Sequence, residues 1–127
     1  MTSAEAIARA EALLPGIAVP EGAEDPRWQA IIEVAGFIDS DPHAVLEFVE
    51  RWGVHPDLDL RQAVATCALE HLLESHFNTC FPSVERLARS NPLFAETLAM
   101  CWRFGDVEVP ENAAKLEQLL KELHRAR

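Results

Sequence analysis

Apolar side chains recur along this chain at the three- and four-residue spacing of amphipathic helices, and sustained strand-like alternation is absent. Three times a short polar residue precedes proline where such a pattern begins: Asp25-Pro26, Asp41-Pro42 and Asn91-Pro92. An Asp or Asn there can accept hydrogen bonds from free helix N–H groups, and proline suits the first helical position. The pattern predicts seven helices, at about residues 2–14, 26–39, 42–53, 58–76, 80–90, 92–104 and 111–126.

The fourth predicted helix has apolar residues on two faces and leaves only a narrow polar line. That line contains, at spacings of three and four, Asp59, Gln62, Thr66, Glu70 and Glu74. A helix buried on two flanks is typical of a layered helical stack, whereas an isolated four-helix bundle usually exposes a wider face. We therefore expect an all-α fold built as such a stack.

The length of 127 residues fits one domain, which we assign to 1–127. The helical body covers 26–105. For residues 1–25 the sequence predicts a peripheral helix followed by a linker rich in proline, glycine and acidic residues. For residues 106–127 it predicts a C-terminal capping helix.

The formal net charge of −10 argues against nonspecific nucleic-acid binding, which requires a basic surface. Residues 21–59 hold ten acids and two bases, whereas the chain from Leu60 onward is close to neutral. This asymmetry can steer a basic partner toward one part of the molecule, or it can simply keep the protein soluble.

No apolar run approaches the roughly 20 residues that cross a bilayer, and the amino terminus lacks the pattern of a signal peptide. We expect a cytoplasmic protein with no membrane contact. The three cysteines, Cys67, Cys80 and Cys101, lack the close pairing of a zinc site and are odd in number, so we expect free, buried thiols.

The segment LEFVERWGVHPDLDLRQAVATCALEHLL, residues 46–73, resembles a HEAT repeat, with an apolar helix, a proline turn and a second helix of small and aliphatic residues. Asp59 and Arg61 match the turn aspartate and basic residue with which that family ties adjacent repeats together. A looser copy, PSVERLARSNPLFAETLAMCW, covers 82–102 but lacks this aspartate and arginine. PRWQAIIEVAGFI matches the second helix of a leading unit.

The resemblance implies a short right-handed α-solenoid of antiparallel helix pairs with capping terminal helices. It also implies a non-catalytic module that binds a protein on its concave face. On this chain that face would carry Glu33, Thr66, Glu70, Glu74, Glu96 and Arg103. Mostly acidic, it suits a basic partner, and some immunity proteins that neutralise bacterial toxins resemble this architecture.

A competing hypothesis is a small metal-dependent hydrolase built on His71 and Glu74, one helical turn apart. His76 lies five residues beyond His71, so the spacing of zinc-protease motifs is not met. Glycine-rich phosphate loops and nucleophile motifs are also absent from the sequence. We therefore expect no enzyme activity, metal or cofactor, and a structural adaptor subunit is a third possibility.

Two further features remain open at this stage. Trp28, Trp52 and Trp102 extend the apolar positions of their predicted helices, which favours core packing, although exposed tryptophan can anchor a partner. The last predicted helix has one leucine-rich face. That face either caps the stack of a monomer or mediates a weak homodimer.

Overall fold

The computed structural model describes residues 1–14, 16 and 24–126, so most of the proposed linker lies outside the described residues. Within this described part all regular structure is helical, which confirms the all-α prediction. The elements are α1 (Ser3–Leu13), α2 (Pro26–Ala35), α3 (Pro42–Trp52), α4 (Leu58–Val64), the π-helical turn η1 (Ala65–Leu69), α5 (Glu70–Ser90), α6 (Pro92–Ala99), the 3-10 turn η2 (Gly105–Glu108) and α7 (Pro110–Arg125).

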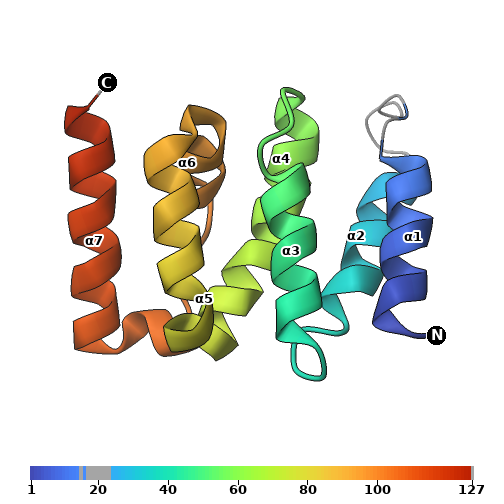
Figure 1. The fold of residues 1–127 in the computed structure, drawn as a ribbon, viewed down its shortest axis with the longest axis horizontal. Helices are drawn as coiled ribbons and strands as arrows, with labels where there is room; N and C mark the ends of the chain where they lie inside the picture. Colours follow the sequence, from blue (N-terminus) through green and yellow to red (C-terminus); the bar gives the residue numbers. More distant parts are fainter. Residues whose placement is uncertain (15, 17–23, 127) are drawn as a thin grey trace.

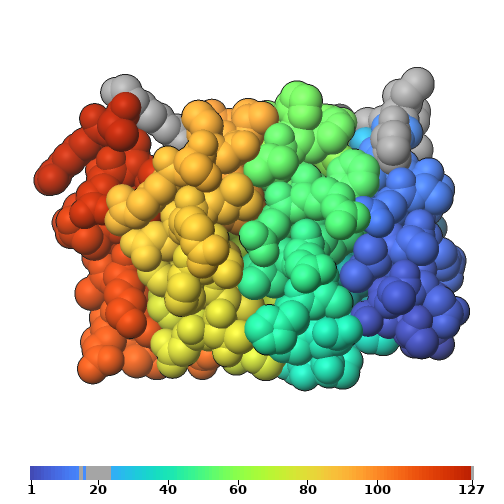
Figure 2. Space-filling view, in the orientation of Figure 1, coloured from blue at the N-terminus to red at the C-terminus, as the bar shows by residue number. Residues whose placement is uncertain are grey.

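The helices stand side by side in one row, with α1 at one end and α7 at the other (Figure 1). The row is two helices deep. We call α1, α3 and residues 77–90 of α5 the first layer, because each contacts the next. We call α2, α4 with η1 and the start of α5, and α6 the second layer. Figure 2 shows the first-layer side as a continuous surface from one end of the row to the other.

The predicted helix starts are confirmed by their capping hydrogen bonds. The Asp25 carboxylate accepts from the Arg27 backbone N–H at 2.9 Å, and the Asn91 side chain accepts from the N–H groups of Leu93 and Phe94. Asp41 accepts from the backbone N–H of Ala44. Each cap precedes a proline at the first helical position, as the dipeptides predict.

The rod from residue 58 to 75 is continuous, but it is not a regular α-helix. Residues 65–69 form a π-helical turn, in which the Glu70 N–H donates to the carbonyl of Ala65, five residues earlier. His76 then leaves the helical conformation (φ −137°, ψ 41°), and the chain crosses from the second layer to the first. The prediction of two separate helices, at 58–76 and 80–90, is therefore correct, and the kink between them lies at His76.

The core runs between the two layers along the whole row. Phe48, Phe77 and Phe94 are its largest fully buried side chains. At one contact between helical pairs, the Thr97 hydroxyl donates to the carbonyl of Gly53 at 2.6 Å. A Cβ on Gly53 would lie 2.9 Å from Cε1 of Phe94, so the absence of a side chain lets α6 pack closely against the end of α3.

Arg27 joins the second layer to the following turn. Its side chain is only 4% exposed and forms ion pairs with Asp25 at 3.2 Å, Asp57 at 3.5 Å and Asp59 at 2.9 Å. Of these, Asp57 and Asp59 belong to the turn before α4 and its first residues, so the guanidinium ties α2 to α4. Hydrogen bonds to the carboxylate of Asp25 raise the pKa of Arg27 further above its usual value.

Arg61 repeats this arrangement one unit along the row. Its side chain is also only 4% exposed. One nitrogen donates to the carbonyls of His55 and Pro56, and another binds the carboxylate of Glu96 on α6 at 2.9 Å. Arg61 therefore binds a carboxylate of the following helical pair, while Asp59 binds Arg27 of the preceding pair.

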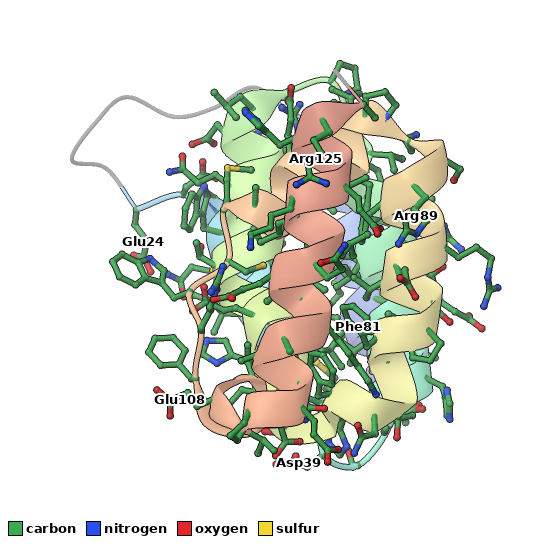
Figure 3. All side chains as sticks on the ribbon, turned by 90° about the vertical axis from the view of Figure 1, so that its left-hand side faces the viewer. Glu24, Asp39, Phe81, Arg89, Glu108 and Arg125 are labelled. Atoms are coloured by element: carbon green, nitrogen blue, oxygen red, sulfur yellow. The ribbon has the colours of Figure 1, made fainter. Side chains whose placement is uncertain are left out.

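The last helix, α7, covers the far end of the row (Figure 3). Leu116 and Leu119 are buried against the same chain, and Leu120 and Leu123 pack partly against the core. On one flank Arg89 of α5 pairs with Glu122 at 2.6 Å. The pKa of the Glu122 carboxyl is lowered by hydrogen bonds from Gln118 and Arg89.

Substituting Gly53 should show how tightly the pairs pack. We expect Gly53→Ala to lower the free energy of unfolding by about 1–3 kcal/mol, because the new methyl group overlaps Phe94 and the Val49 carbonyl. Gly36→Ala is the matched control at another helix end. Gly36 is exposed and meets only the Glu33 carbonyl, so its change should be within about 0.5 kcal/mol. Urea unfolding measures both, and equal effects would contradict this packing.

Candidate binding face

The residues that the sequence assigned to partner binding all lie on the second layer or on the segment that follows it. We call the outer surface of α2, α4, η1, residues 70–76 and α6, together with residues 101–108, the second-layer face. Figure 3 shows the chain around Glu108 along one side of the molecule, opposite the side that carries Arg89.

Residues 101–106, which we call the strap, lie lengthwise over η1 and the start of α5. The Cys101 thiol contacts the Ala65 carbonyl at 3.6 Å, and the Trp102 backbone N–H donates to Glu70 Oε1 at 3.1 Å. Gly105 has a positive φ of 52° and lies against Glu74, where a Cβ would come within 2.7 Å of a backbone oxygen. The strap is therefore held at successive points along the helix beneath it.

Two more contacts fix the end of this segment. The Asp106 carboxylate accepts from the backbone N–H of Phe77 at 3.4 Å. That N–H follows the kink at His76 and lies in the first turn of the new helix. Backbone N–H groups in a first turn have no carbonyl acceptor within their own helix. Val107 is buried in the core and anchors the chain before α7 begins. The predicted helix over 92–104 is wrong beyond Ala99, because these residues instead form the strap.

Glu70 is the clearest correction to the sequence-based site. It is only 6% exposed, so it does not line an open groove. The π-helical turn inserts one residue into the helical register, and the exposed line therefore runs from Gln62 and Thr66 to His71 and Ser75. Glu70 rotates under the strap, where its carboxylate accepts the Trp102 N–H. No proline or glycine marks this turn, so the sequence carried no signal for it.

The other candidate side chains are exposed or half-buried, and most are already paired. Glu33 lies 3.7 Å from Arg9, and Glu96 holds Arg61. Arg103 binds Glu117 of α7 at 3.1 Å. The Thr66 hydroxyl donates to the carbonyl of Gln62 within its own helix. Glu96 and Arg103 therefore also have structural partners.

The His71 and Glu74 side chains are in contact, and Glu70 lies on the other side of the His71 ring. Nδ1 of His71 lies 2.9 Å from Glu74, and Nε2 lies 3.8 Å from Glu70. Both ring nitrogens thus face carboxylates. Within residues 1–14, 16 and 24–126, no group of three or more His, Cys, Asp or Glu side chains is arranged to hold a metal ion.

The cysteines are poor nucleophiles in this environment. Burial raises the pKa of the thiols of Cys67, Cys80 and Cys101 above the usual value, and the nearby Glu70 carboxylate raises those of Cys67 and Cys101 further. All three thiols are free. Since the thiolate is the reactive form, none has the low pKa of a catalytic cysteine.

Two of the three tryptophans pack against the core, and the third is exposed to solvent. Trp28 and Trp52 pack partly against the core, and their indole N–H groups donate to the carboxylates of Asp59 and Glu11. Trp102 is 70% exposed, so the expectation that it packs in the core is wrong. The reason is that α6 ends at Ala99 and the extended strap turns its side chain outward. Other large apolar side chains exposed on the second-layer face are Ile32, Leu58 and Phe104.

Charge is distributed unequally between the two layers. Residues 25–36, 55–77 and 92–108 contain nine acids and three arginines, a formal charge of −6. The first-layer helices, residues 3–13, 42–52 and 77–90, contain five acids and four arginines, a formal charge of −1. The second-layer ranges therefore carry more of the excess negative charge than the first-layer helices do.

Open grooves flank α7 at the end of the row. One groove, of about 610 Å³, lies between α5 and α7, and Phe81 and Arg89 are among the residues that line it (Figure 3). Arg89 forms ion pairs there with Glu85 and Glu122, and Lys115 also lines the groove.

Comparison with family models, curated proteins and solved structures finds no match to this chain. Function must therefore be argued from the molecule itself. None of the helices that the structure describes is both long and apolar enough to span a bilayer.

Removing the Glu70 carboxylate should release the strap. A hydrogen bond to a charged acceptor contributes about 1.5–3 kcal/mol, so we expect the Trp102 amide to exchange with solvent at least about tenfold faster in Glu70→Leu than in the wild type. Glu70→Gln keeps an oxygen acceptor and should exchange at a rate nearer to that of the wild type. Hydrogen exchange followed by NMR measures this. Unchanged Trp102 protection in Glu70→Leu would show that the strap is held by other contacts.

Proposed function

We propose that this chain is a non-catalytic protein-binding module of the cytoplasm, and that its acidic second-layer face binds a basic protein. We further propose that the row of helices is a short right-handed α-solenoid of HEAT-like pairs, closed by α7 as a cap. The function rests on the difference in charge between the two faces, and the architecture rests on the repeated arginine ties.

The ties support a repeat architecture because similar contacts recur at similar intervals along the chain. Arg27 binds Asp59, 32 residues later, and Arg61 binds Glu96, 35 residues later. Each arginine lies near the start of a second-layer helix and reaches the second-layer element of the next unit. In a stack of similar units, each unit is stabilised mainly by its immediate neighbours. The polar outer side of α7, with Lys115, Gln118 and Lys121 exposed, suits a terminal cap.

The charge difference supports a basic partner because the acids of the second layer outnumber its arginines even after the ion pairs between them are counted. Arg27 and Arg61 are buried in ion pairs, and Arg103 is bound to Glu117. A basic protein approaching the molecule is therefore attracted toward this face more strongly than toward the first layer. Ile32, Leu58, Trp102 and Phe104 add exposed apolar area to the same side, as an interface core requires.

The site chemistry supports binding over catalysis. His71 is engaged by its two neighbouring carboxylates, and the thiols have raised pKa values. A toxin neutralised by an immunity protein is one basic partner of the proposed kind, and a permanent subunit of a larger assembly is another. Both use the same face, and they differ in how long the complex lasts.

Site-specific cross-linking tests which face binds. A photoreactive amino acid at Gln62 samples the second layer, and the same amino acid at Glu47 samples the first layer; both positions are exposed. In extracts of the native host, we expect a basic protein to be linked from position 62 and not from position 47. Linking from 47 alone would overturn the proposal.

Charge variants test whether the negative charge of the second-layer face attracts the partner that is cross-linked from position 62. We expect Glu108→Lys, on the second-layer face, to weaken binding several-fold at low salt, while Glu47→Lys, with the same charge change on the first layer, has little effect. The difference should shrink as salt rises, because a surface charge is screened over about 10 Å at 0.1 M salt. Equal effects of the two variants would exclude the charge difference as the cause of recognition.

A further inference from the structure

The strap presents two aromatic side chains in a fixed direction. Phe104 has extended backbone angles (φ −135°, ψ 162°), and alternate residues of an extended segment project to the same side. Trp102 and Phe104 are alternate residues, and they are 70% and 40% exposed. Arg103, between them, binds Glu117 on α7, which is consistent with its pointing the other way.

The backbone that carries these rings is held before any partner arrives. Hydrogen bonds of Trp102 to Glu70 and of Asp106 to Phe77, with the close contact of Gly105 on Glu74, fix both ends of the strap. A fixed segment loses little conformational freedom on binding, and tryptophan has only two side-chain torsions to order. The arrangement has the properties of a preformed interface anchor.

The charges around the rings are negative. Glu70 and Glu74 lie beneath the strap, and Asp106 and Glu108 continue it. The strap's own cation, Arg103, is bound to Glu117 and does not offset them. An aromatic face attracts a cation, tryptophan most strongly, and surrounding carboxylates add to that attraction. Arginine fits best because its planar guanidinium can stack on a ring and donate to a carboxylate together.

We infer that Trp102 and Phe104 form the anchor of the second-layer face, and that they receive an arginine side chain from an extended basic segment of the partner. This inference rests on the proposed function and specifies the chemistry of the partner. Trp102 supplies the stacking surface and Phe104 extends it along the strap. Of the surrounding carboxylates, the partly exposed Glu74 and the exposed Glu108 are the ones that can attract the guanidinium from solvent.

A short basic peptide tests the anchor directly. The probe is a capped peptide of four Arg-Gly repeats, titrated at low salt into the full chain carrying fluorinated tryptophan. We expect the fluorine resonance of Trp102 to shift saturably, and those of Trp28 and Trp52, whose indoles are bound to carboxylates, to stay nearly unchanged. The corresponding Lys-Gly peptide should bind more weakly, and a Glu-Gly peptide should not bind.

Variants show whether the ring itself is responsible. Because variants at position 102 lack the fluorinated Trp102, their affinity for the peptide is measured by isothermal titration calorimetry. We expect Trp102→Leu to weaken binding of the Arg-Gly peptide about fivefold to tenfold, and Trp102→Phe to weaken it less. Leu58→Ala is the matched control, since it removes an exposed apolar side chain from the same face away from the strap, and it should change affinity less than twofold. Trp102 is exposed, so Trp102→Leu should keep the wild-type unfolding free energy.

Two results would overturn the inference. The first is equal affinity of the wild type and Trp102→Leu for the Arg-Gly peptide, which would leave only general charge attraction. The second is tighter binding of an uncharged Leu-Gly peptide at Trp102, which would make the anchor purely apolar. In either case a partner cross-linked from position 62 and not from 47 would still support the proposed function, so the failure of each idea can be recognised separately.

Discussion

Arg27 and Arg61 each reach from one helical pair to a carboxylate of the next at 2.9 Å, with side chains that are only 4% exposed. A buried guanidinium is costly unless its partners are in place, so each tie fixes the position of the neighbouring second-layer helix. The fork of donors on Arg61 also holds the carbonyls of the turn before α4. The order of the row depends on these two groups as much as on its apolar core.

The same ties determine what the second layer shows to solvent. Its arginines are used in the ties and neutralise only some of its acids, so the face keeps a formal charge of −6. The largest exposed ring, Trp102, lies on a strap held by the buried Glu70. Glu70 thus links the packing of the second layer to the position of the exposed Trp102. The carboxylate that the sequence suggested as a contact for the partner instead positions the aromatic residue that we propose makes the contact.

Much of the fold could be read from the sequence, because helix starts are local. The Asp-Pro and Asn-Pro pairs predicted three of them correctly. The turn residues Asp59 and Arg61 form ion pairs with Arg27 and Glu96. The π-helical turn and the strap could not be predicted. The strap depends on contacts between residues about 30 positions apart, such as that between Trp102 and Glu70, and helical periodicity carries no information about them. The π-helical turn contains no proline or glycine that would mark it in the sequence.

The most direct test of this account is a double-mutant cycle on unfolding free energy for Arg61→Met and Glu96→Gln. If this tie between a buried guanidinium and a partly exposed carboxylate holds the pairs together, the two changes should be coupled by about 1–3 kcal/mol, as for residues in one salt-bridge network. The exposed pair Arg103 and Glu117, treated in the same way, should give about 0.2–1 kcal/mol. Coupling between Arg61 and Glu96 no larger than that of the exposed pair would contradict the account.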